Sequence, residues 1–346
     1  MVNIYWDINP ILRYQRNFNF ISSERKIGKT YTTLWFLLKQ AILKNKQFVY
    51  LCRTEKERQQ GILKSAFSKI ISEQYPNTTF KFTTSECYLV QETEENEKEM
   101  ILLGYCLALS MAEEAKRNSY PDVKYMVLDE YSLPKYSTSK YVHGWDEPDA
   151  LLSLYQTIDA DRDEVIVFCL SNNYTFYNPY HMHPAFNIPF TPAGKTWTSE
   201  NVLFQRPQMS EGLKTQKAKT RFHKMIQGTE YGDHASSGIY IDDSPEFIKS
   251  KTGNCKYIFT LSHKGVQYGV WSGMQVGLIF IDDVVDKTCP LIYALTFDDH
   301  RENTMLTQSK GFAPLQWLSK NYKIGNVRYC SQQIKAKAEE AIRLLL

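Results

Sequence analysis

The sequence has no Cys-x-x-Cys pair, no long apolar run and no large excess of charge. Its seven cysteines are scattered and odd in number, which argues against a zinc site or a disulfide framework and favours a reducing compartment. No apolar run approaches the ~20 residues that a membrane helix needs. Residues 1–10 have the pattern of neither a signal nor a transit peptide. The sequence therefore predicts a cytoplasmic protein with no membrane partner.

Length and charge set the scale of the molecule. A chain of 346 residues, 43% hydrophobic and 23% charged, is typical of a folded protein with about two domains. The net charge is only +3, so any contact with nucleic acid must come from local basic clusters.

A candidate phosphate-binding loop lies near the amino terminus. Apolar residues alternate up to Ile21, a polar loop follows, and Gly28-Lys29-Thr30 opens a helical pattern. In such a loop the backbone amides surround the phosphates of ATP, the lysine reaches the β and γ oxygens, and the hydroxyl binds Mg²⁺. Ser23 stands where the first glycine is usual, and the alternative is an ordinary helix start. The predicted nucleotide-binding residues are Ser23, Glu24, Arg25, Lys26, Ile27, Gly28, Lys29, Thr30 and Tyr31.

A second motif, residues 125–130, consists of four apolar residues followed by Asp129 and Glu130. In a Walker B strand the aspartate binds Mg²⁺ and the glutamate activates the attacking water. A strand that ends in a polar turn is the structural alternative. Two Walker motifs in the correct order favour an ATP- and Mg²⁺-dependent site in which Thr30 and Asp129 bind the metal and Lys29 and Glu130 are catalytic.

Two further residues are candidates for the same site. Asn172 follows a continuous apolar strand, residues 165–170, where an amide would sense the γ-phosphate. Arg162 precedes that strand, where multimeric ATPases present an arginine to a neighbouring subunit. The alternatives are an Asn-rich turn and a surface ion pair.

The order of elements predicts an α/β fold. A helix from 29 to 43, a strand from 47 to 52 and a second helix from 55 to 71 argue for a mostly parallel sheet with helices on both faces. Prolines at 179, 184, 189, 192 and 207 mark the exit from this first domain, residues 1–207. A basic linker, residues 208–235, follows and includes a small helix; it either contacts nucleic acid or a neighbouring subunit, or is simply soluble.

The last domain, residues 236–346, has a different composition. Three close-set strands predict an antiparallel meander, followed by a fourth strand at 291–296 and a terminal helix from about 332. This α+β order suggests a ribonuclease-H-like architecture, whose nucleases bind two metals with clustered carboxylates. Asp282, Asp283, Asp298 and Asp299 lie near strand ends, but the first strand has no acid. We therefore predict a non-catalytic domain with these acids at turns.

Taken together, these motifs resemble the DNA-packaging ATPases of small phi-29-like podophages, which are relatives of the large terminases. The resemblance covers nearly the whole chain. It rests on residues 23–31, 127–130 and 169–172, Asn178-Pro179-Tyr180, Lys219-Thr220-Arg221-Phe222, residues 228–232 and Gly269-Val270-Trp271. Ser23 replaces the family's first glycine, and Glu55, beside Lys56, occupies a position that is basic in the family.

The resemblance implies an ASCE P-loop ATPase domain, a vestigial nuclease-like domain and a homopentameric ring. It also implies that the ring acts in the host cytoplasm, docks on the portal vertex of a preformed procapsid, in some relatives through a packaging RNA, and pushes in double-stranded DNA. Arg162 matches the family's trans-acting arginine finger, and Arg25 matches the arginine of terminase-type loops. The candidate DNA-gripping residues are Lys116 and Arg117, which could equally be surface charge, and Lys135 and Lys140 of a basic and aromatic loop.

Three other functions remain open on the sequence. A helicase-type or AAA+ translocase would act without a capsid. A terminase with an active nuclease would need a metal cluster. A nucleotide switch or capsid-binding module would bind ATP without DNA-stimulated turnover.

Overall fold

The computed structural model describes residues 5–92, 97–134, 137, 139–226, 247–306 and 312–345. It contains two compact units, residues 1–242 and 243–346, each described by itself. Lys135 and the motif at 228–232 lie outside the described residues.

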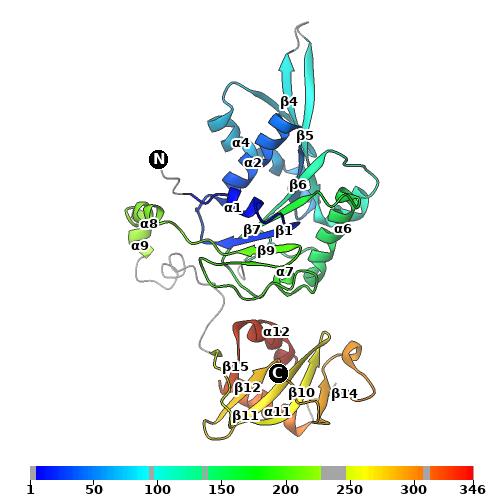
Figure 1. Cartoon of the computed structure of the whole chain (residues 1–346), viewed down its shortest axis with the longest axis vertical. Helices are drawn as coiled ribbons and strands as arrows, with labels where there is room; N and C mark the ends of the chain where they lie inside the picture. Colours follow the sequence, from blue (N-terminus) through cyan, green and yellow to red (C-terminus); the bar gives the residue numbers. More distant parts are fainter. Residues whose placement is uncertain are drawn as a thin grey trace. The chain divides into compact units, whose positions relative to one another are not determined.

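The first unit is built on a nine-stranded sheet (Figure 1). Its strand order is β3-β4-β5-β2-β6-β7-β1-β9-β8, and the central pairs β5-β2-β6-β7-β1-β9 are all parallel. The strands are β1 (Phe18–Ser23), β2 (Gln47–Cys52), β3 (Thr79–Phe82), β4 (Glu86–Glu92), β5 (Lys98–Ala108), β6 (Val123–Asp129), β7 (Ile166–Asn172), β8 (Thr196–Thr198) and β9 (Val202–Gln205).

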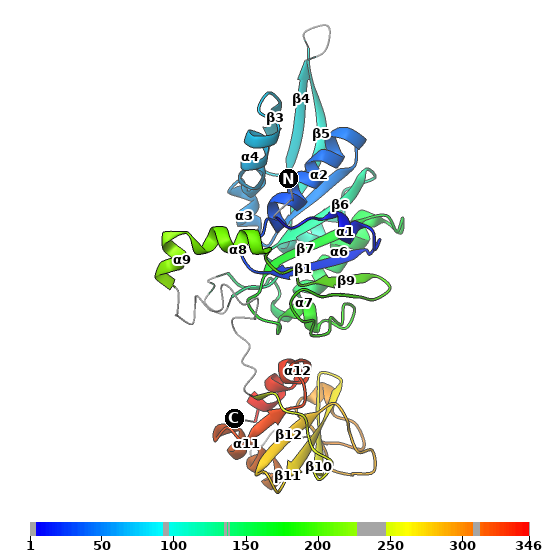
Figure 2. The same cartoon turned by 60° about the vertical axis from the view of Figure 1, so that its left-hand side comes forward.

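Helices cover both faces of this sheet (Figures 1 and 2). The α-helices of the unit are α1 (Asn9–Leu12), α2 (Lys29–Lys44), α3 (Glu55–Gln59), α4 (Ile62–Gln74), α5 (Ala112–Ala115), α6 (Glu147–Asp159), α7 (Pro179–Met182), α8 (Glu211–Ala218) and α9 (Arg221–Ile226). Short 3₁₀ turns are η1 (Leu109–Met111) and η2 (Gly144–Asp146).

The side chains of the buried strands point alternately to the two faces of the sheet, which explains why helices cover both faces. In β1, Phe20 belongs to the core cluster that contains α6, whereas the next residue, Ile21, belongs to the cluster that contains α2 and α4. Successive side chains of a strand point to opposite faces, so a strand with every position buried must be covered on both sides. The predicted α/β fold with a mostly parallel sheet is confirmed.

Two helical predictions need correction. The helix expected over 55–71 is two helices, because Gly61 adopts a left-handed φ of 76° between α3 and α4. The single small helix expected in the basic linker is also two, α8 and α9, separated by Lys219 and Thr220.

Among the described residues, no helix is both long enough and apolar enough to cross a lipid bilayer.

The second unit contains a six-stranded sheet with the order β14-β13-β10-β11-β12-β15. Strands β10 to β12 form the predicted antiparallel meander, and β13 pairs in parallel with β10. Buried apolar residues of β10 to β12 pack against α11 and α12. The elements are β10 (Lys256–His263), β11 (Val266–Gly273), β12 (Leu278–Asp282), β13 (Ile292–Ala294), η4 (Phe297–Asp299), β14 (Met305–Leu306), α11 (Ala313–Lys323), β15 (Val327–Tyr329) and α12 (Gln332–Arg343).

We predict that Gly269→Ala destabilises this sheet. A Cβ at Gly269 would overlap the Val284 carbonyl oxygen and lie 2.8 Å from Trp271 Nε1. Overpacking of this kind costs ~1–3 kcal/mol. Hydrogen exchange of β11 and β12 in the full chain measures the loss. Gly253→Ala is the matched control, because nothing lies within 4 Å of its Cβ. Equal protection in the two variants would contradict the packing described here.

Candidate active site

The predicted motifs meet at one edge of the first sheet. Strand β7 lies between β6 and β1, and all three run parallel. In this register Ser23 lies opposite Asn172, and Asp129 lies opposite Leu170. The carboxyl ends of the three strands therefore place the phosphate loop, the two Walker acids and Asn172 side by side. Ligands of open α/β sheets bind at such an edge.

The phosphate loop leads directly into α2. Gly28 is the residue before the helix and adopts a φ of 98°, a left-handed conformation that glycine accepts without strain. Lys29 is buried, and its Nζ donates to Ser23 Oγ at 2.7 Å and to the Glu24 carbonyl at 3.3 Å. Ser23 thus supplies a hydroxyl that orients the lysine, a contact that the glycine usual at this position cannot make.

The Walker acids lie next to this loop. Thr30 Oγ1 donates to Asp129 Oδ1 at 3.3 Å, so the two predicted metal-binding residues are in contact. The Glu130 amide donates to the same carboxylate at 3.1 Å, and Glu130 itself has a φ of 60° with an exposed side chain. Non-glycine residues in this region of φ are uncommon and gather at functional sites.

Burial shifts both charged groups of the site toward their neutral forms. It lowers the pKa of Lys29 to about 8, against the opposing effect of Asp129, and raises the pKa of Asp129 to about 6. Desolvation disfavours the charged form of either group. A bound cation beside Asp129 and a bound anion beside Lys29 would reverse these shifts, so the electrostatics fit a metal–polyphosphate ligand.

Arg25 and Asn172 are brought together by a residue that the sequence motifs did not reveal. The hydroxyl of Tyr174, a buried residue, accepts from Arg25 Nη2 at 2.7 Å and from Asn172 Nδ2 at 3.3 Å. The Asn173 amide also donates to the Ser23 carbonyl at 3.0 Å, which ties the end of β7 to the phosphate loop. An aromatic residue two positions past a strand carries no sequence signal of this role.

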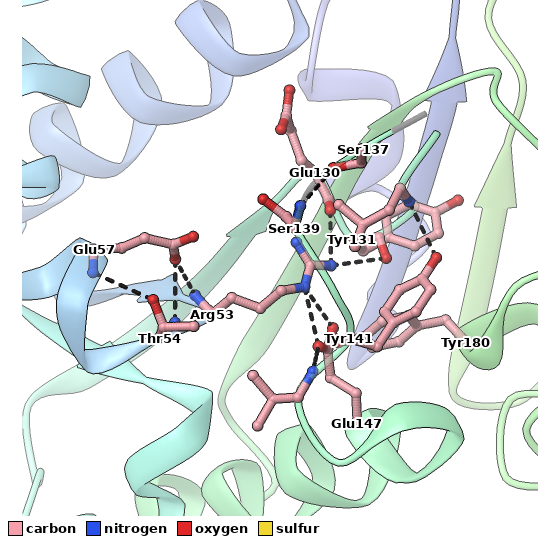
Figure 3. Close-up of polar contacts among 12 residues, drawn as sticks. Arg53, Thr54, Glu57, Glu130, Tyr131, Ser137, Ser139, Tyr141, Glu147 and Tyr180 are labelled. Atoms are coloured by element: carbon pink, nitrogen blue, oxygen red, sulfur yellow. Dashed lines mark hydrogen bonds and ion pairs between the residues drawn. The ribbon is translucent and has the colours of Figure 1, made fainter. Parts of the chain in front are cut away.

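Next to the predicted Walker acids, Arg53 holds the backbone that directly follows β6 (Figure 3). Its Nη2 donates to the carbonyl oxygens of Glu130 at 2.9 Å and Tyr131 at 3.1 Å. Its Nε donates to both carboxylate oxygens of Glu147, at 3.1 and 3.0 Å, in a pair whose side chains are 7% and 0% exposed. In the sequence, Arg53 stands directly after a buried strand, a position where functional side chains are common. Glu147, at the start of α6, cannot be told from an exposed helix residue by its sequence context.

Hydrogen bonds from uncharged donors, and one pair around a neutral histidine, complete this network. Tyr180 donates its hydroxyl to Glu147 Oε1 at 2.8 Å, and the Val142 amide donates to Oε2 at 2.6 Å. His181 is buried and burial lowers its pKa to about 3, so the ring is neutral. Its Nδ1 therefore donates to the Phe176 carbonyl and its Nε2 accepts from the Tyr131 hydroxyl. Both carboxylate oxygens of Glu147 have partners, which a buried carboxylate requires.

Arg162 lies at the opposite edge of the sheet from its own phosphate loop. It precedes β7, and its Nη2 donates to the carbonyls of Ile158 at 2.7 Å and Tyr120 at 3.1 Å. Its Nη1 contacts the Pro121 carbonyl. The structure therefore does not bring Arg162 together with Lys29 or Glu130 of the same chain.

The described basic residues predicted to grip DNA lie on the surface. Lys116 forms an exposed ion pair with Glu113 at 2.7 Å, and Arg117 and Lys140 are exposed. Exposed pairs of this kind contribute at most about 1 kcal/mol and leave the charge accessible to a polyanion.

In the second unit, two of the acids near strand ends, Asp282 and Asp299, have structural partners. Asp282 forms an ion pair with Lys251, so the protein itself supplies its counter-charge. Asp299 accepts from the amides of Lys264 at 2.8 Å and Gly265 at 2.7 Å and so stabilises the β10–β11 turn. Among the described residues, no group of three or more His, Cys, Asp or Glu side chains is placed to hold a metal ion.

Comparison with known proteins gives matches over the full length. The family model described as "Podovirus DNA encapsidation protein (Gp16)" matches residues 2–345. The DNA packaging protein of Bacillus phage phi29 is 29% identical over 342 residues, which cover 99% of this chain and 98% of the relative. That of Bacillus phage B103 is 28% identical over 338 residues, covering 96% and 98%.

Solved structures agree with these matches. A chain of the bacteriophage Phi-29 viral genome packaging motor assembly superimposes with a TM-score of 0.75 at 28% identity, covering 99% of this chain and 100% of the other. A chain of the Phi-28 gp11 DNA packaging motor has a TM-score of 0.61 at 17% identity, covering 99% and 98%, and supports the fold.

The pKa values predict a pH window for metal–nucleotide binding. Below pH about 6 Asp129 is protonated and loses its negative charge for Mg²⁺, and above pH about 8 Lys29 loses its positive charge for phosphate. We expect affinity to be maximal between these values and to fall ~tenfold per pH unit below the lower one. Equilibrium binding of Mg²⁺-nucleotide from pH 5 to 9 measures this. Asp129→Asn should abolish the acidic limb alone, and a flat wild-type profile would contradict the prediction.

Because Arg53 both pairs with Glu147 and holds the Glu130 carbonyl, we predict that variants of the pair affect the free energy of unfolding and the rate of nucleotide hydrolysis differently. Arg53→Met leaves Glu147 buried without its cation and should cost ~3–5 kcal/mol. The double change Arg53→Met, Glu147→Leu should recover most of that stability, because it removes both buried charges. Nucleotide hydrolysis should be slower than in the wild type in both the single and the double variant, since the Glu130 carbonyl has lost its donor.

Chemical unfolding and steady-state hydrolysis of the full chain measure the two effects. Tyr180→Phe, which removes one hydrogen bond to Glu147, is the control with a smaller loss. Recovery of hydrolysis together with stability in the double variant would show that Arg53 does not position Glu130.

Proposed function

The chain belongs to the family of podovirus DNA encapsidation proteins, and we propose that it is the ATP-hydrolysing motor that moves double-stranded viral DNA into a preformed procapsid. The observation that carries the proposal is the contact between Thr30 and Asp129 beside the buried Lys29. It joins both Walker motifs at one edge of the sheet in a chain matched by the family model over residues 2–345.

The residues of the loop fit a metal–triphosphate. Lys29 and the amides that precede α2 would hold the phosphates, and Thr30 and Asp129 would hold Mg²⁺, which neutralises charge on the β and γ oxygens. A pocket of about 1010 Å³ adjoins the loop at Gly28 and Lys26. Its aromatic residues Tyr5, Tyr31 and Trp35 suit a purine base, which stacks on such rings.

Hydrolysis would use the exposed Glu130 as the base that orients and deprotonates water. Its carbonyl is held by Arg53, so the left-handed backbone at this residue is supported from behind. Asn172 and Arg25 share the Tyr174 hydroxyl, a position from which both would respond to the γ-phosphate.

We further propose that sites are shared between subunits of a ring, with five subunits as the resemblance implies. Arg162 is far along the sheet from its own Lys29 and would serve the neighbouring subunit, after leaving the carbonyls of Tyr120 and Ile158. The ring would work in the host cytoplasm and dock at the portal vertex, directly or through a packaging RNA. Lys116, Arg117 and Lys140, with Lys135, would contact the DNA backbone without sequence preference.

A packaging assay tests the function. The purified chain, portal-bearing procapsids, DNA and ATP should give DNase-protected DNA, and Glu130→Gln should bind ATP but protect none. DNA-stimulated hydrolysis without protection would point to a translocase that acts outside capsids. ATP binding without stimulated hydrolysis would point to a nucleotide switch.

Mixed rings test the shared site. Arg162→Ala should lower hydrolysis by ~10³–10⁵-fold, the effect of losing a trans arginine. Mixing it with Glu130→Gln should regain part of the activity, because some interfaces then combine an intact Glu130 with an intact Arg162. A mixture as inactive as either variant alone would assign Arg162 to holding its own loop.

A further inference from the structure

The linker helix α8 is docked on the ATPase unit. Met209 and Leu213 are buried in the same core cluster as Ile27 of the phosphate loop and Trp6, whose amide donates to the Ile27 carbonyl at 2.9 Å. Ser210 caps the helix by accepting from the Leu213 amide at 3.4 Å. The helix is therefore fixed where its side chains meet residues about two hundred positions earlier in the chain (Figure 2).

One lysine of α8 contacts the phosphate loop itself. Lys217 Nζ donates to the Arg25 carbonyl oxygen at 2.6 Å, and the side chain is half-buried. Lys214 and Lys219, on the same segment, are exposed. The positive charge of Lys217 also acts on Lys29, whose pKa it lowers. Lys217 is thus a second cation of the phosphate loop, supplied from outside both Walker motifs.

The loop contains a charge that needs such a cation. Glu24 is only 7% exposed, and within the described chain its Oε2 is buried without a hydrogen-bond partner. Burial raises the pKa of Glu24, and Lys217 is the largest of the opposing charges, ahead of Lys214 and Lys29. A carboxylate inside a loop that must bind a polyanion repels it unless a nearby cation offsets the charge.

Resting on the proposed function, we propose that Lys217 is a positioning residue of the ATP site, which offsets Glu24 and holds the loop through the Arg25 carbonyl. Triphosphate then binds well only while α8 is docked. By linkage, bound nucleotide strengthens the docking of α8 by the same factor. Nucleotide occupancy is in this way coupled to the helix that leads toward the second unit.

Equilibrium binding of a fluorescent ATP analogue to the full chain tests the role. Lys217→Met should weaken binding about tenfold or more, since it leaves the loop carboxylate unopposed. Lys219→Met, which removes an equal charge two residues away, should change binding less than about twofold. Lys217→Arg should bind nearly as well as wild type.

The double variant Glu24→Gln, Lys217→Met separates charge compensation from helix damage. It should regain most of the lost affinity, because no unopposed carboxylate remains. Tryptic cleavage after Lys214 and Lys219 should also slow when ATP saturates the wild type, and not in Lys217→Met. Unchanged affinity in Lys217→Met, or no recovery in the double variant, would overturn the inference. Absence of ATP binding by the wild type would instead overturn the proposed function.

Discussion

The candidate nucleotide site depends on two opposite charges at one sheet edge, the buried Lys29 and the half-buried Asp129. Lys29 is the first residue of α2, and Asp129 is the last residue of β6. Burial lowers the pKa of Lys29 and raises that of Asp129, so it favours the neutral form of each. Among the described residues neither group forms an ion pair: Lys29 contacts a hydroxyl and a carbonyl, and Asp129 contacts a hydroxyl and an amide. The electrostatics of this candidate site therefore fit a metal and a polyphosphate as ligands. Surrounding elements serve to keep this edge in place.

A buried ion pair, Arg53 and Glu147, provides that support by holding the backbone carbonyls of Glu130 and Tyr131. Here the geometry is complete, because Arg53 bonds to two carbonyls and a carboxylate, and the carboxylate also accepts from Tyr180 and Val142. A satisfied buried pair specifies one arrangement, because breaking any contact exposes an unpaired charge. The strained backbone of Glu130 is therefore fixed by structure, whereas its exposed side chain remains available for chemistry.

The two ends of the chain differ in how their acids are used. In the first unit Asp129 accepts hydrogen bonds from a threonine hydroxyl and a backbone amide. In the second unit Asp282 forms an ion pair with Lys251, and Asp299 accepts from two amides of a turn. The same residue type thus lies in the candidate active site of one unit and has structural partners in the other. The difference lies in whether the protein itself supplies the counter-charge.

The sequence by itself determined the fold class, the family resemblance and the two Walker motifs, because these depend on local order: apolar strands, a left-handed glycine and acids at a strand end. Local pattern failed at Gly61, where a turn divides the helix expected over 55–71. Only the tertiary structure assembled the rest. Tyr174 joins Arg25 to Asn172, Glu147 anchors Arg53 from 94 positions away, and Lys217 reaches Arg25 across 192 positions. Hydrogen bonds between such distant residues depend on strand order and helix docking, which no short window of sequence encodes.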